Sequence, residues 1–137
     1  MYRKNIKAYT TQNLQAEMAV ADPYRVIQLM MQGCIERLAQ SKGAIERRDY
    51  EGKAIAISKS MALINGLQDA LDLSYGKVPE DLFALYDYMK QRLLDASSNM
   101  DVKPLDEVGR LMLTIKSGWD SIPLDDRMQA LSQQASI

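Results

Sequence analysis

The amino-acid sequence predicts an all-α protein, an antiparallel up-and-down four-helix bundle with an additional short N-terminal helical segment. Three observations support this prediction. Apolar residues recur every three or four positions along four successive stretches, which is the spacing of amphipathic helices. The turns between these stretches are short, so consecutive helices must run antiparallel. The alternating runs and hairpin dipeptides that are typical of β-strands do not occur.

The first long helix is predicted between Asp22 and Asp49. Asp22 can accept a hydrogen bond from a free first-turn amide, and Pro23 suits the first helical position because it has no amide hydrogen to lose. The apolar face is wider than one neighbouring helix covers, so this helix is expected to be the central member of the bundle. Its apolar positions are Ile27, Met31, Cys34, Leu38 and Ile45, flanked by Val26, Met30, Gly33 and Ala44.

The next helix is predicted from Tyr50 to about Leu73, with Asp49 as its cap. It has two apolar faces. The main stripe is expected in the core and consists of Ile57, Met61, Ile64, Leu67 and Leu71. The other face consists of Ile55, Ala62, Gly66 and Leu73. Such a face either contacts a further helix of the same bundle or forms a groove for a partner, and the sequence leaves both interpretations open.

Two further helices are predicted from Pro79 to about Asn99 and from Pro104 to Ile122, since each begins with a proline followed by acidic residues. Their core positions are Leu82, Leu85, Tyr86, Met89, Leu93 and Ala96 in the first, and Leu105, Val108, Leu111, Met112, Ile115, Trp119 and Ile122 in the second. Phe83 and Leu94 fall on a common flank outside the core stripe, and Leu113 is expected to be exposed.

The ends of the chain complete the predicted organisation. Residues 1–21 form an N-terminal cap or lid segment, in which Ile6 and Tyr9 have the helical spacing needed to lie on the bundle. Residues 22–122 form the helical bundle. Residues 123–137 are expected to be a flexible tail, with Met128 and Leu131 on a short helix.

The amino-acid composition excludes several classes of function. The 17 basic and 18 acidic residues nearly balance, which argues against binding to nucleic acid. No apolar run could cross a bilayer or serve as a signal peptide, so we expect a cytoplasmic protein without membrane insertion. Histidine is absent, which rules out Glu-x-x-His metal sites and histidine-activated nucleophiles. We therefore expect no cofactor and no enzymatic activity, and interpret Asp69, Asp72 and Glu80 as helix-end caps rather than catalytic carboxylates.

Several motifs resemble those of the flagellar secretion chaperone FliS family. They are, in order, Tyr9; Asp22-Pro23, Ile27 through Met31, and Gly33; Ile64, Leu67, Leu71 and Asp72; Leu85-Tyr86-Asp87-Tyr88-Met89; and Trp119. Met31-Gln32-Gly33 departs from the family, which often has Leu-Tyr-Asp-Gly there, and the tail matches no pattern. The resemblance implies a cytoplasmic protein that holds flagellin before export by the flagellar type III apparatus. It also implies that the flagellin C-terminal segment binds around the bundle in apolar grooves, which the N-terminal segment partly occupies when flagellin is absent.

The apolar positions left over after packing four helices are the expected client-binding groove, because helix-in-groove recognition needs such surfaces. They are Val26, Met30, Ile55, Ala62, Gly66, Leu73, Phe83 and Leu94, with Ile6 and Tyr9 as the lid. Export-gate components or a co-chaperone are further partners to be considered. The alternative is a self-associating structural or adaptor bundle, whose spare apolar faces form a permanent homodimer.

Overall fold

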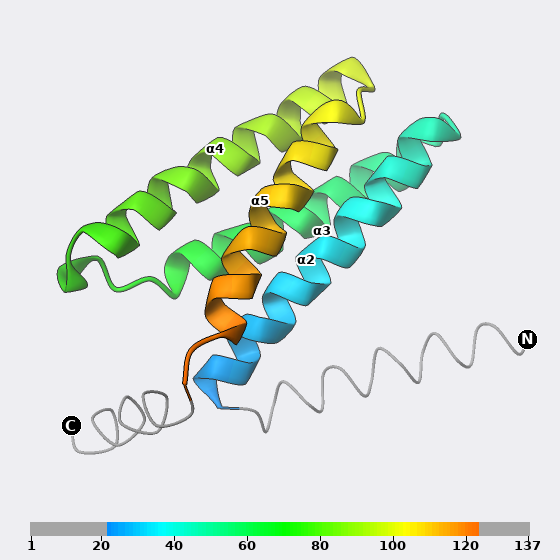
Figure 1. Cartoon of the computed structure of the whole chain (residues 1–137). Helices are drawn as coiled ribbons and strands as arrows, with labels where there is room; N and C mark the ends of the chain where they lie inside the picture. The colour runs from blue at the N-terminus through cyan, green and yellow to red at the C-terminus, as the bar shows by residue number, and fades with distance from the viewer. Residues whose placement is uncertain (1–21, 124–137) are drawn as a thin grey trace, which may run out of the picture.

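The protein is an all-α bundle of four long helices, as predicted. The computed structural model describes residues 22–123, so the predicted lid residues Ile6 and Tyr9 and the tail 124–137 lie outside the described residues. The elements, in order, are α2 (Pro23–Glu46), α3 (Tyr50–Asp69), the 3₁₀ helix η1 (Leu73–Tyr75), α4 (Lys77–Asn99) and α5 (Lys103–Asp120). Figure 1 shows consecutive long helices running in opposite directions. No strand occurs between residues 22 and 123.

The four helices pack as a closed ring. α3 lies between α2 and α4, and α5 lies between α4 and α2. The buried side chains of all four meet inside this ring, as the predicted stripes require. The core cluster consists of Met31, Cys34, Leu38, Ile45, Ile57, Ile64, Leu67, Tyr86, Met89, Leu93, Ala96, Leu105, Val108 and Met112. None of the described helices is long and apolar enough to cross a membrane.

The first two helices begin at the predicted aspartates. A carboxylate oxygen of Asp22 accepts a hydrogen bond from the backbone N–H of Arg25 at 2.8 Å. Asp49 does the same for Gly52 at 2.9 Å. Each carboxylate satisfies an amide that has no partner within its helix, which stabilises the helix end by about 1 kcal/mol.

The end of α3 differs from the prediction. The helix stops at Asp69, whereas the apolar pattern suggested that it continues to about Leu73. The carboxylate of Asp72 accepts a hydrogen bond from the backbone N–H of Ser74 at 3.0 Å, which starts η1 instead of a further α-helical turn. Gly76 then has a φ of 104°, a conformation that favours glycine. α4 consequently begins at Lys77, two positions before Pro79.

Candidate functional site

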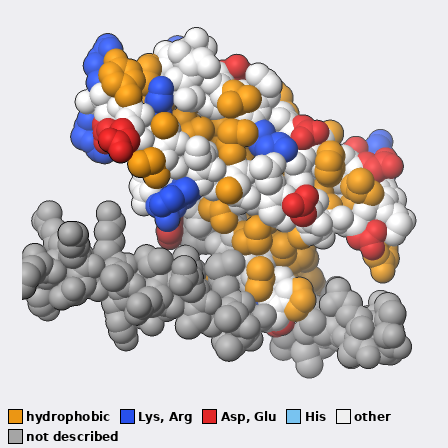
Figure 2. Space-filling model, turned by 180° about the vertical axis from the view of Figure 1, so that it is seen from behind, with side chains coloured by type: hydrophobic (Ala, Val, Ile, Leu, Met, Phe, Trp, Pro, Cys, Tyr) orange, Lys and Arg blue, Asp and Glu red, His pale blue; other side chains and the backbone are white. Residues whose placement is uncertain are grey.

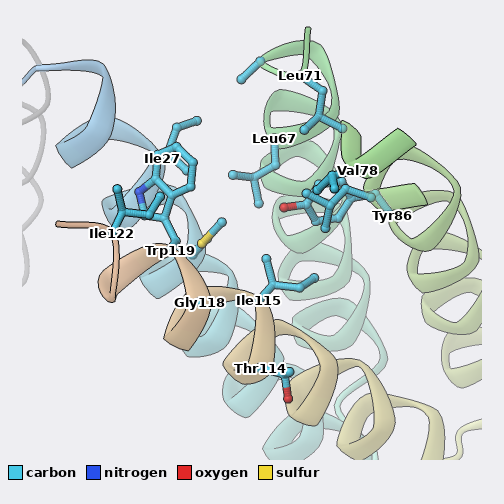
Figure 3. A pocket seen from close by; sticks show the side chains of 13 residues that line it. Ile27, Leu67, Leu71, Val78, Tyr86, Thr114, Ile115, Gly118, Trp119 and Ile122 are labelled. Atoms are coloured by element: carbon cyan, nitrogen blue, oxygen red, sulfur yellow. The ribbon is translucent and has the colours of Figure 1, made fainter. Parts of the chain in front are cut away.

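An apolar cavity of about 420 Å³ opens at one end of the helix ring. Figure 1 shows α4 and α5 close together at the loop that joins them and diverging toward the opposite end, where this cavity lies. We call it the end slot. All four helices contribute to it, and its lining consists of Ile27, Met31, Leu67, Ala70, Leu71, Val78, Leu82, Tyr86, Thr114, Ile115, Gly118, Trp119 and Ile122 (Figure 3).

The polar contacts between α4 and α5 lie near the middle of α4 and the start of α5, away from the slot. There the hydroxyl of Tyr88 donates a hydrogen bond to the Glu107 carboxylate, and Arg92 Nε lies 3.2 Å from the same group. On the slot side of Tyr88, no hydrogen bond or ion pair joins α4 to α5 among residues 22–123. The two helices are therefore joined by polar contacts from the middle of α4, while no such contact between described residues holds them together at the slot.

The two walls of the slot are α5 and α4, and each is joined by hydrogen bonds to its other neighbouring helix. On one wall, Trp119 stacks on Tyr24 with ring centroids 5.2 Å apart, and its indole N–H donates to the Tyr24 carbonyl at 3.1 Å. These contacts join α5 to α2. On the other wall, the Gln68 amide donates to the Phe83 carbonyl at 2.9 Å and to the Asp87 carboxylate at 2.8 Å, joining α3 to α4. The α2–α5 pair and the α3–α4 pair thus form two rigid walls.

The slot is deep, apolar and open to solvent. Met31, Leu67 and Tyr86 form its buried floor. At its mouth Val78 is 71% exposed. A Cβ atom added to Gly118 would meet no atom within 4 Å, so the wall at this position has free space in front of it. Along α5 the lining runs from Thr114 to Trp119, which corresponds to about 7.5 Å or one and a half helical turns, and Ile122 follows just beyond the end of the helix.

The floor of the slot carries no charge at neutral pH. Burial raises the pKa of Tyr86 to about 12, with the neighbouring Cys34 as a smaller cause. Burial also raises the pKa of the Cys34 thiol to about 12. Both groups stay protonated, so neither is a nucleophile. Within the described part of the chain, no group of three or more His, Cys, Asp or Glu residues could hold a metal ion. This arrangement suits the binding of apolar side chains.

The expected helix-end carboxylates lie near the slot mouth but outside it. Asp69, Asp72 and Glu80 are exposed. The hydroxyl and backbone N–H of Ser74 donate to Asp72 and lower the pKa of its carboxyl. Asp72 therefore caps η1 as expected, whereas no side-chain hydrogen bond caps the N-terminus of α4, in whose first turn Glu80 lies.

None of the eight residues expected to form the groove lines the end slot. Four are large and at least one-third exposed: Ile55 at 49%, Leu73 at 47%, Leu94 at 46% and Phe83 at 37%. Ala62 is also exposed. They lie on α3, η1 and α4, away from the core. Figure 2 shows hydrophobic side chains reaching the surface at several separate places, with charged side chains between them.

Of the remaining three expected groove residues, two lie on α2 and one lies on α3. Val26 and Met30 are half-buried on α2. A Cβ atom on Gly66 would lie only 2.3 Å from the terminal methyl of Met30, so these two residues pack against each other. Of the two interpretations left open for this face, Gly66 therefore fits contact with a helix of the same bundle, since it packs against α2.

Sequence patterning missed the slot because its lining has the same periodicity as a filled core. Most lining residues, such as Ile27, Leu82 and Ile115, belong to the predicted core stripes. Val78 stood outside every stripe, since its helix was expected to begin at Pro79. One sequence feature could have indicated the slot. Thr114 and Gly118 lie one turn apart on α5, and there a polar and a small residue interrupt an otherwise bulky apolar face.

Comparison with known proteins places the chain in a family. Residues 5–125 match the family model described as flagellar protein FliS. The flagellar secretion chaperone FliSB of Pseudomonas aeruginosa is 45% identical over 120 residues, covering 87% of this chain and 95% of that protein. The flagellar secretion chaperones FliS of Vibrio cholerae and Salmonella typhimurium are 31% and 33% identical, over 88% and 85% of this chain and 90% and 88% of theirs. The chain therefore belongs to the FliS family of flagellar secretion chaperones.

Proposed function

We propose that this protein is a non-enzymatic, cytoplasmic export chaperone for flagellin. It binds the disordered C-terminal segment of flagellin in apolar grooves, prevents premature polymerisation and keeps flagellin competent for flagellar type III secretion. The observation that carries this proposal is the end slot, an apolar cavity that opens to solvent at one end of the bundle. The family to which the chain belongs supports the export role.

The shape of the apolar surface suits a client that folds on binding. Ordering a disordered segment costs several kcal/mol, so such a client needs a long interface rather than one compact pocket. The end slot can take apolar side chains from about one and a half turns of a client helix, because its lining extends over about 7.5 Å of α5. The exposed Ile55, Phe83 and Leu94 on α3 and α4 provide further contacts outside it. A client helix in the slot and a second segment across α3 and α4 would together wrap the bundle.

The N-terminal segment completes the proposal as a lid. Ile6 and Tyr9 would cover part of the groove when no client is bound, which lowers apparent affinity by the fraction of molecules that are open. Deleting residues 1–15 should leave the bundle folded, and should either tighten client binding or promote self-association through the uncovered surface. Unchanged affinity together with unchanged mass in solution would show that the segment is no lid.

The second candidate is a self-associating adaptor, which the exposed apolar residues on α3 and α4 favour. A permanent homodimer would keep Ile55 and Leu94 covered by its partner. Measurement of molecular mass across a dilution series separates the two functions, because the chaperone is expected to be monomeric when dilute. Export-gate components and a co-chaperone would add to either function without replacing it.

The test uses calorimetry with two forms of flagellin monomer, one complete and one lacking the C-terminal segment. We expect a soluble complex with the first and none with the second. Equal binding to both forms would remove the proposed client site.

Filling the slot tests where the client binds. Gly118→Leu adds a side chain into open space in the slot, and should weaken flagellin binding about tenfold or more. Gly109→Leu is the matched control, because a Cβ there also meets no atom within 4 Å but lies outside the slot. The control should bind flagellin as the unmodified protein does. If both variants bind equally well, the client does not use the slot.

A further inference from the structure

The chain leaves the bundle at the end slot itself. Ile122 lines the slot, and Pro123, which follows it, is the last residue that the structure describes. Residues 124–137 therefore start at the edge of an open apolar cavity, with no distance to cross before they reach it. This position makes them the first segment to consider as an occupant of the slot.

The tail sequence repeats the motif that begins α5. Pro104-Leu105-Asp106-Glu107 stands in the first turn of α5, where Leu105 is only 2% exposed. The tail starts with the nearly identical Pro123-Leu124-Asp125-Asp126. After this start, Met128, Leu131 and Ala135 follow at positions i, i+3 and i+7, the spacing of one helix face.

The dimensions of tail and slot agree. The helical distance from Met128 to Leu131 is about 4.5 Å, which fits within the slot's lining of about 7.5 Å along α5. A short helix–helix connection takes two to eight residues, and Pro123 to Arg127 supplies them. The tail can therefore turn back at the mouth and lay one apolar face along the slot, antiparallel to α5.

The charges at the mouth also agree. Lys77, the first residue of α4, stands next to Val78 at the slot mouth, and the N-terminus of α4 has no side-chain cap. Asp125 and Asp126 lie in the part of the tail that would pass this point. Negative side chains near a helix N-terminus and a lysine are stabilising.

We propose that residues 124–137 of this chain dock in its own end slot, with Met128 and Leu131 against the apolar lining. Docking covers the slot in the free protein. If the slot also binds flagellin, which rests on the proposed function above, the tail competes with the client. A slot that is closed nine-tenths of the time would weaken apparent client affinity about tenfold.

Trp119 reports on docking without any client. It is the only tryptophan of the chain, and its ring faces the slot (Figure 3). The assay is acrylamide quenching of its fluorescence in the full chain. The docking variant carries Met128→Asp with Leu131→Asp, and the control carries Gln129→Asp with Gln133→Asp. The control adds the same charge to the opposite side of a helix, and circular dichroism checks that all three proteins are equally helical.

We expect Trp119 to be quenched at least twofold more strongly in the docking variant than in the unmodified protein, and equally in the control. Equal quenching in all three proteins would overturn the proposal, as would the same increase in both variants. If protection of Trp119 in the unmodified protein disappears on dilution, a second copy fills the slot and intramolecular docking is wrong. If Ile6→Asp with Tyr9→Asp exposes Trp119 and the docking variant does not, the N-terminal segment is the occupant.

A second measurement separates this proposal from the proposed function. A peptide of the flagellin C-terminal segment is titrated into the docking variant and its control. We expect about three- to tenfold tighter binding to the docking variant. If Trp119 responds as expected but the peptide binds neither protein, tail docking stands and the client assignment fails. If the peptide binds both equally and Trp119 shows no change, the client assignment stands and tail docking fails.

Discussion

α3 carries one buried and one exposed isoleucine, and truncating each to alanine tests which of its faces belongs to the core. Ile64 has 0% exposure, whereas Ile55 is 49% exposed. Ile64→Ala removes the equivalent of three methylene groups, each worth about 0.8 kcal/mol when buried. The cavity that remains adds to this, so we expect a total loss of about 3–4 kcal/mol in the free energy of unfolding. For a domain of this size, that lowers Tm by about 10–20 °C.

Ile55→Ala should have a much smaller effect. About half of the side chain is already in water, so roughly 1 kcal/mol of burial is lost at most. Alanine recovers part of this through its higher helix propensity, leaving a net loss of about 0.5 kcal/mol. A charge at the same position, Ile55→Asp, should still weaken flagellin binding about tenfold or more, because the client would remove the carboxylate from water.

Thermal melts followed by circular dichroism, together with urea titrations, measure both alanine variants, and calorimetry with flagellin measures Ile55→Asp. Equal destabilisation by Ile55→Ala and Ile64→Ala would show that the Ile55 face is packed, and would refute the assignment of two faces to α3. Unchanged flagellin binding by Ile55→Asp would remove this face from the client site.

Three further predictions concern the described bundle. Arg48 has a φ of 56°, a conformation that favours glycine, so Arg48→Gly should raise the free energy of unfolding by about 0.5–1 kcal/mol in urea titrations. Met100 has a φ of 49°, but its side chain packs against the core, so Met100→Gly should raise the free energy of unfolding by less. Cys34 is buried with a pKa of about 12, so a thiol reagent should label it only under unfolding conditions; fast labelling of native protein would contradict its burial. The hydrogen bond from Tyr88 holds the pKa of Glu107 below its ordinary value of 4.5. The ionised Glu107 therefore contributes its full stabilisation above pH 4.5, and this stabilisation is lost as the pH falls through the lower pKa of the folded state. Glu107→Gln should therefore flatten the acid side of a plot of Tm against pH, and an unchanged slope would contradict this.

The helices could be predicted from sequence because their signals are local. Asp22 and Asp49 cap the helices that follow them, and the inward stripes of all four helices are those of the core. Periodicity, however, gives only the direction in which a side chain points. Leu67 and Ile115 point inward whether the space in front of them is filled or open, and that depends on how far α4 and α5 diverge. The end slot could not be predicted for this reason.

The surface of α3 shows a similar limit. Ile55 and Gly66 share one face in sequence terms, yet one is exposed and the other packs against Met30. Which of two such positions a neighbouring helix covers depends on the tilt and register of that neighbour, and neither is encoded locally. Met61, expected in the core, is half-buried for the same reason, so a charge there should cost less than one at Ile64.

The polar contacts of Tyr88 and Arg92 with Glu107 mark the point about which the α3–α4 pair can tilt relative to α5. Val78 at the mouth lies ten residues from Tyr88, an arm of about 15 Å. A tilt of about 10° around this fulcrum would displace the mouth by about 2.6 Å at the end of that arm, roughly the difference between admitting a small side chain and a large one. The buried Met89 lies one residue from this point and would move by only about 0.3 Å. If the slot binds flagellin as proposed, such a tilt would let one bundle accommodate client side chains of different size while the residues nearest Tyr88 keep their packing.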